Sequence, residues 1–137
     1  MKFVFFGKPF AKQSTRFTCS GFAYTPAKIK TAENNIRAQA IQQLPKGFVL
    51  FQGEIFITKC HFIFVPPKSM RKRDLKKIKD GEIVYKKTRP DLTDNLFKGL
   101  IDSLSGIVFS DDSRIVAMDN VKKYYGFVPR IELEIQE

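Results

Sequence analysis

The run from Phe48 to Val65 constrains the fold of this chain more than any other segment. It is rich in Phe, Ile and Val, and Gly53 interrupts it. Branched and aromatic residues favour strands, and a glycine inside such a run is typical of a bulge. Pro66 and Pro67 end the run, because proline has no backbone N–H to donate. The pattern predicts one long bulged strand, or two strands, near the middle of a sheet.

Two other segments have the apolar spacing of helices. Thr25 and Pro26 are a suitable N-cap and first helical residue, and apolar residues then recur every three or four positions, which predicts a helix from about Pro26 to Leu44. A second helix is predicted from Asp94 to Ser105, with Gly106 as its C-terminal stop. One face of this second helix is apolar, and the other carries Asp94, Lys98 and Asp102.

Short extended runs account for most of the remainder. Strands are predicted at 3–7 and 22–24 and, after Gly106, in the runs IVF, RIVAM, VKKYY and RIELEI, with a turn at 110–113. The basic segment 68–89 predicts a surface helix or a mobile loop, closed by Asp80 and Gly81. We therefore expect one α+β domain, residues 1–137, with a mixed β-sheet and two main helices packed on it.

The charge of the chain favours a polyanionic partner. Lys and Arg number 24 against 14 Asp and Glu, which gives a formal charge of +10. Nucleic acid is the leading partner and an anionic membrane surface the weaker one, whereas a small acidic substrate is not indicated. The apolar run near the N-terminus is too short for a signal peptide, so a soluble cytoplasmic protein is expected. Cys19 and Cys60 lack the spacing of a zinc site and are expected to be reduced. His61 is expected to be a satisfied or half-buried strand residue and not a catalytic base.

Several aspartates lie within this basic chain. Asp91 and Asp94 bracket the start of the second helix, and Asp111 and Asp112 follow in the next turn. Carboxylates are the oxygen ligands that Mg²⁺ and Mn²⁺ prefer, and nucleases use them to hold such ions. Lys98, four residues after Asp94, would stabilise charge on a phosphate. The same pattern also suits a helix cap, an ordinary turn and a surface ion pair.

The segment PDLTDNLFKGLIDSLSGIVFSDDSRI, from Pro90 to Ile115, resembles the signature of RusA-type Holliday junction resolvases, which are common in phages and prophages. The N-terminal GKPFAKQSTRFTCSGFAYTPAKIKTAE is similar to the opening of the same family. The resemblance implies a homodimer that binds four-way DNA junctions in the bacterial cytoplasm and, with Mg²⁺ or Mn²⁺, makes paired symmetric nicks. It assigns Asp94, Lys98 and Asp112 to the catalytic site, with Asp111 as a supporting ligand.

The first catalytic aspartate is assigned to Asp91. The family has one residue between its two motif aspartates, whereas this chain has Leu92 and Thr93. Asp91 would still meet Asp94 if the helix begins earlier or if a bulge absorbs the extra residue. Two alternatives therefore stay open, namely a non-catalytic DNA-binding recombination protein and a nuclease for other branched DNA. The residues expected to contact DNA are Lys8, Lys12, Arg16, Lys68, Arg71, Lys72, Arg73, Lys76 and Arg89.

Overall fold

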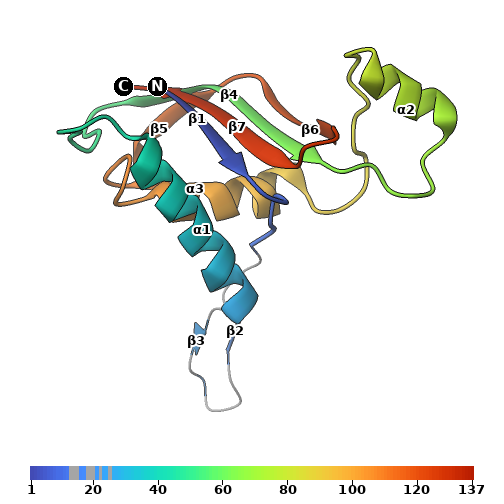
Figure 1. Ribbon diagram of the computed structural model, residues 1–137. Coiled ribbons are helices and arrows are strands. Elements are labelled where there is room, and N and C mark those ends of the chain that lie inside the picture. The colour runs from blue at the N-terminus through green and yellow to red at the C-terminus, as the bar shows by residue number, and fades with distance from the viewer. Residues whose placement is uncertain (13–15, 18–20, 22, 25) are drawn as a thin grey trace. The chain divides into compact units, whose positions relative to one another are not determined.

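The computed structural model describes residues 1–12, 16–17, 21, 23–24 and 26–137 (Figure 1). These residues form two compact units. The sheet unit comprises Met1–Pro9, Gly53–Arg89 and Ile115–Glu137, and the helical unit comprises Phe10–Gln52 and Pro90–Arg114. Helices and strands are both present, which confirms the predicted α+β class. The predicted N-cap Thr25, and Cys19, lie outside the described residues.

The sheet unit contains a five-stranded mixed sheet, so the predicted sheet type is confirmed. Central β4 pairs antiparallel with β7, which in turn pairs antiparallel with β1, as Figure 1 shows. On its other edge β4 pairs in parallel with β5 and then with β6. The strand bounds are Lys2–Phe6 for β1, Ile55–Phe64 for β4, Ile115–Met118 for β5, Val121–Tyr125 for β6 and Arg130–Gln136 for β7.

The segment from Phe48 to Val65 contains one bulged strand, β4, which is shorter than predicted. Its register shifts between Ile57 and Lys59 against β7, and its last five residues are all buried. The expectation of strand structure from Phe48 was wrong, because only Phe51 makes an isolated bridge, to Phe109. The predicted strand IVF was also wrong. Gly106 has a φ of 83° and its N–H donates to the carbonyl of Phe109 at 2.8 Å, which closes a turn there.

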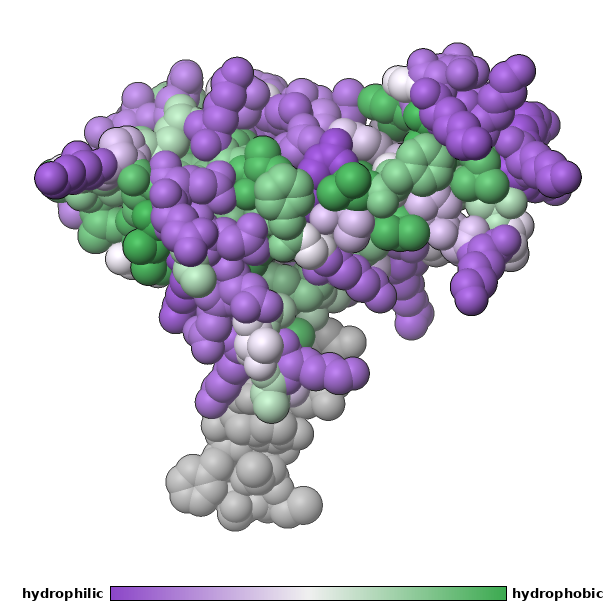
Figure 2. Space-filling view, viewed as in Figure 1, coloured by the Kyte–Doolittle hydropathy of each residue, from purple (hydrophilic) through white to green (hydrophobic). Residues whose placement is uncertain are grey.

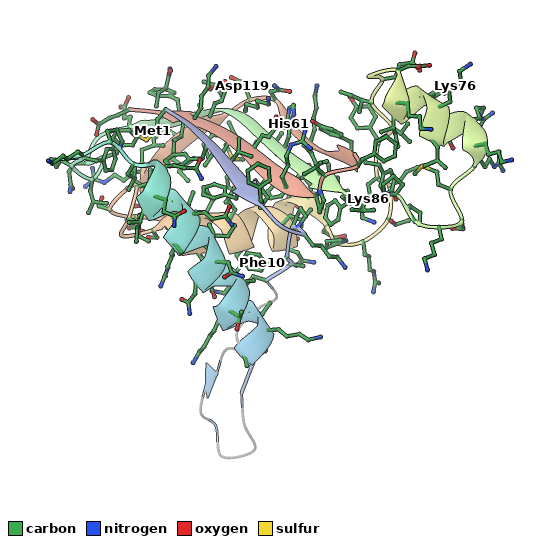
Figure 3. All side chains as sticks on the ribbon, viewed as in Figure 1. Met1, Phe10, His61, Lys76, Lys86 and Asp119 are labelled. Carbon is green, nitrogen blue, oxygen red and sulfur yellow. The ribbon has the colours of Figure 1, made fainter. Side chains whose placement is uncertain are left out.

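The edge formed by β5 and β6 is interrupted at Asn120. This residue has a φ of 54°, which Asn tolerates better than most residues. Its side-chain oxygen lies 3.1 Å from Nε2 of His61, and the other ring nitrogen lies 3.0 Å from the hydroxyl of Tyr124. His61, labelled on β4 in Figure 3, is thus buried with both nitrogens satisfied, as expected.

The basic segment of the sheet unit contains helix α2, Lys72–Lys79, which confirms the prediction of a surface helix. All of its side chains are exposed or half-buried, and Lys76 projects from it in Figure 3. Figure 2 shows hydrophilic residues over most of its visible surface. Gly81, with a φ of 85°, follows the end of the helix. No helix of the described residues is long and apolar enough to cross a bilayer.

The helical unit is built on two helices that pack against each other. Nε of Arg37 on the first donates to the carbonyl of Ser103 on the second at 3.1 Å. The first helix agrees with the prediction, whereas the second begins earlier than predicted, as a π-helical turn. The elements are β2 (Arg16–Phe17), β3 (Ala23–Tyr24), α1 (Ala27–Gln43), η1 (Leu92–Phe97), α3 (Lys98–Leu104) and η2 (Asp112–Arg114).

Candidate metal and DNA site

The π-helical turn η1 holds the first two candidate aspartates. Asp91 is its N-cap, with extended backbone (φ −68°, ψ 140°), and Asp94 lies in its first turn. The N–H of Leu96 donates to the carbonyl of Asp91 at 3.1 Å, which is a bond between residues five apart. Such a turn holds one residue more than an α-helical turn. The extra residue between the aspartates is therefore absorbed by a local bulge, and both side chains remain exposed.

Lys98 begins α3 directly after the π-helical turn. Its Nζ lies 3.7 Å from Oδ2 of Asp102, one helical turn onward. Within the described part of the chain, its ion pair is with Asp102 and not with Asp94. A wider turn shifts Asp94 out of the four-residue register in which it would face Lys98. Of the charged face predicted for Asp94, Lys98 and Asp102, the structure thus has the contact between Lys98 and Asp102 and not one between Asp94 and Lys98.

Asp111 and Asp112 are adjacent carboxyl groups before β5. The Ser113 hydroxyl donates to Oδ2 of Asp111 at 2.9 Å. The bonds from Ser113 and Asp112 lower the pKa of Asp111. The pKa of Asp112 is raised, first by its hydrogen bond to Asp111 and then by burial and the negative charges of Asp111 and Asp102. The carboxyl group of Asp112 is therefore influenced by two neighbouring carboxylates, those of Asp111 and Asp102.

The chemistry of these carboxylates fits a hard divalent cation, which prefers oxygen ligands. The arrangement in space is less complete. Among the residues that the structure describes, no group of three or more His, Cys, Asp or Glu side chains lies where it would hold one metal ion. Asp91 and Asp94 lie at η1 and Asp111 and Asp112 lie before β5, and no three of these four described residues form such a group in this structure.

A second charged cluster, which the sequence reasoning missed, lies beside Lys98. Lys12 Nζ lies 3.0 Å from Asp102 and 3.5 Å from Glu33 of α1. Burial lowers the pKa of Lys12, but its hydrogen bonds and ion pairs with Asp102 and Glu33 outweigh burial and raise it. Glu33 is almost fully buried. The sequence did contain a sign that Glu33 is buried, because Glu33 lies four residues after Ile29 and three before Ile36, on the apolar face of the helix.

The residues predicted to contact DNA are divided between the two units. In the helical unit, the ammonium of Lys12 is half-buried between two carboxylates, and Arg16 is described only as a backbone position in β2. In the sheet unit the remaining seven residues have exposed side chains, and three of them belong to α2. These seven are Lys8, Lys68, Arg71, Lys72, Arg73, Lys76 and Arg89.

Comparison with known proteins covers nearly the whole chain. The protein is 30% identical to the uncharacterized protein YqaN of Bacillus subtilis strain 168 over 142 aligned positions, which span 100% of this chain and 96% of that one. A family model described as endodeoxyribonuclease RusA matches residues 7–136, which include the aspartates of η1, Lys98 and the Asp111–Asp112 pair. The chain therefore belongs to the RusA endodeoxyribonuclease family.

Proposed function

We propose that the protein is a metal-dependent endonuclease that binds four-way DNA junctions and resolves them by paired symmetric nicks during recombination or repair. The supporting observation is that the chain belongs to the RusA family and that the exposed aspartates of η1, Lys98 and the pair Asp111 and Asp112 all lie in one structural unit. A protein with a formal charge of +10 is also suited to a polyanionic substrate.

The proposed roles follow from the chemistry of each side chain. Asp91, Asp94 and Asp112 would hold Mg²⁺ or Mn²⁺, with Asp111 in support. The bound ion would supply activation of water and stabilisation of charge on the reacting phosphate. Lys98 carries an ammonium whose side chain is 47% exposed, so it is accessible to a phosphate oxygen. Substrate binding would bring the aspartates of η1 and those before β5 to a common ion.

The basic surface would hold the DNA backbone. Exposed lysines and arginines of the sheet unit, including three on α2, supply positive charge without base recognition. Two symmetric cuts on a two-fold symmetric junction suit a homodimer, which would present two copies of the site. We place the protein in the cytoplasm of a bacterial host, encoded by a phage or prophage, where recombining DNA is the substrate.

The test is cleavage of a synthetic four-way junction by the purified protein with Mg²⁺. Symmetric nicks are expected on the junction, and a linear duplex of the same sequence should stay intact. Asp94→Asn and Asp112→Asn should abolish cleavage and leave junction binding as tight or tighter, since each removes negative charge near a polyanion. Asp80→Asn, at the C-terminal end of α2, makes the same change of charge and should cleave normally. Equal activity in all three variants would refute the assigned site.

A second function is favoured by one observation. Because the described residues bring no three carboxylates to one position, a non-catalytic DNA-binding recombination protein also fits the structure. Calorimetric titration with Mn²⁺ separates the two functions. A nuclease should show a binding site that disappears in Asp94→Asn, and a binding-only protein should show none. Comparison of junction, flap and duplex cleavage at one salt concentration would identify a nuclease for other branched DNA.

A further inference from the structure

Asp102 is shared by two lysines. Its Oδ2 lies 3.0 Å from Nζ of Lys12 and 3.7 Å from Nζ of Lys98. The side chain of Asp102 is 27% exposed, that of Lys12 is 21% exposed and that of Lys98 is 47% exposed. One carboxylate oxygen thus connects a half-buried lysine to one that is open to solvent.

Lys12, the more buried of the two lysines, is held by several contacts. The N–H of Lys12 donates to the carbonyl of Asn95 at 3.1 Å, which fixes its backbone against η1. Two residues earlier, the ring of Phe10 packs on Gly99 of α3, where an added Cβ would lie 2.9 Å from the ring. The ammonium of Lys12 is held in addition by buried Glu33. Lys12 is therefore a fixed anchor for Asp102.

The charges of the cluster leave Asp102 able to interact with Lys98 as well as with Lys12. Lys12 and Lys98 carry two positive charges, and Glu33 and Asp102 carry two negative ones. Lys12 is also paired with Glu33, so its positive charge is divided between two carboxylates and does not fully neutralise Asp102. Asp102 can thus attract Lys98 as well, through a longer contact that leaves the ammonium partly hydrated. A lysine side chain has many rotamers, and such a contact restricts them.

We propose that Asp102 is a positioning residue, which is fixed by Lys12 and directs the ammonium of Lys98 toward the reacting phosphate. This inference rests on the proposed function, in which Lys98 assists at the phosphate. Asp102 itself touches neither substrate nor ion in this scheme. Its contribution is to hold Lys98 near its working position before the DNA arrives, so that less freedom is lost when the phosphate binds. The competing account is that Asp102 only braces α3 against the N-terminal segment.

A double-mutant cycle on single-turnover junction cleavage distinguishes these accounts. Asp102→Asn should lower the cleavage rate about tenfold, the order of loss expected when a positioned group is released. Its junction Kd should be unchanged or lower, because a negative charge is removed. Lys98→Ala should lower the rate further, and the double variant should cleave no more slowly than Lys98→Ala. Losses that multiply in the double variant would overturn the proposal.

Two further variants control for folding. Glu33→Gln removes a carboxylate from the same cluster but keeps both partners of the contact between Asp102 and Lys98. Lys12 then pairs with Asp102 alone, which weakens that contact only in part, so the loss of rate should be clearly smaller than in Asp102→Asn. Asp102→Glu should restore part of the rate lost in Asp102→Asn, since it returns the carboxylate. A loss in Glu33→Gln equal to that in Asp102→Asn would instead identify the cluster as a structural brace, and the proposal would then be wrong.

A readout without cleavage separates this proposal from the proposed function. The mobility of the Lys98 ammonium can be followed by ¹⁵N relaxation of the lysine side chains in the full-length protein. Asp102→Asn should increase the mobility of Lys98, whereas Lys12 should stay held by Glu33. An unchanged Lys98 signal would refute the positioning role. Failure of the wild-type protein to cut junctions, with the mobility change still observed, would refute the proposed nuclease and leave the contact between Asp102 and Lys98 established.

Discussion

The N–H of Leu96 bonds to the carbonyl of Asp91 at 3.1 Å, five residues back along the chain. An α-helix would close this bond between residues four apart. The difference of one residue matches the additional residue between Asp91 and Asp94. Because Thr93 is exposed, the bulge that it creates disturbs no buried contact. The additional residue is therefore accommodated within η1, and Gly99, Leu100 and Ile101 of the helix that follows are buried.

Deletion of Thr93 should convert this π-helical turn into an α-helical one. The variant should keep its melting temperature within a few degrees, since only an exposed residue is removed. Asp91 and Asp94 would then have the spacing of the family signature, so the affinity for Mn²⁺ measured by calorimetry should be equal or higher. Thr93→Ala keeps the chain length and should bind Mn²⁺ like the wild type. Loss of Mn²⁺ binding in the deletion alone would show that the bulge is required.

Gly99→Ala should destabilise the protein and weaken the anchoring of Lys12. The added Cβ would lie 2.9 Å from Cε2 of Phe10, which is too close for a carbon contact. Alanine improves helix propensity by about 1 kcal/mol, but overpacking costs about 1–3 kcal/mol, so the net change should be a loss of about 1 kcal/mol. Urea unfolding measures this loss. Phe10→Leu in the same background should recover part of it, and no recovery would exclude Phe10 as its cause.

The sequence predicted the helices and the central strand because their periodicity is local. Residues 26–44 repeat apolar side chains at helical spacing, and α1 follows that pattern closely. The run IVF has the composition of a strand, yet Gly106 turns the chain there, so among the described residues Phe109 is the only residue of this run that forms a β-bridge. The π-helical turn itself was not predicted. An earlier helix start and a bulge were the two ways considered to accommodate Leu92 and Thr93, and periodicity does not distinguish them.

The candidate site was only partly predictable for a different reason. The aspartates and Lys98 lie within one short motif, so their residue types and order could be read directly. Lys12 is 21 residues from Glu33 and still farther from Asp102, and their contact depends on how α1 and α3 pack. A basic N-terminal element suggested DNA binding for Lys12, whereas its ammonium lies between carboxylates. Contacts between distant segments carry no local pattern that a single sequence reveals.

The stability of the protein should fall as the pH decreases from about 7 to about 5 because of His61. Burial lowers the pKa of His61, the charges of Lys59 and Lys122 lower it further, and the hydrogen bond to Asn120 only partly opposes this. The unfolded chain, with the ordinary pKa of about 6.5, then binds the proton more tightly than the folded one. His61 is the only histidine of the chain, so no other histidine contributes.

The measurement is urea unfolding of the wild type and His61→Phe at both pH values. The variant should lose about 1–3 kcal/mol at neutral pH, because the Tyr124 hydroxyl and the Asn120 amide lose a partner. Its free energy of unfolding should nevertheless vary less between the two pH values than that of the wild type. An equal dependence on pH in both proteins would show that His61 does not cause it.

The charges of α2 should set the salt dependence of DNA binding. Lys72, Arg73 and Lys76 are exposed on a helix whose side chains are at most half-buried, so their replacement by Gln should leave the fold intact. For each phosphate that the variant no longer neutralises, the slope of log affinity against log salt concentration should become shallower by about 0.9. A matched variant with Gln at Lys28, Lys30 and Lys46 makes the same change of net charge from exposed positions outside α2.

Fluorescence anisotropy with a labelled junction gives both slopes. If the two triple variants have the same slope, net charge alone explains the binding; a smaller slope only for the α2 variant would mark this helix as a direct contact with the phosphate backbone.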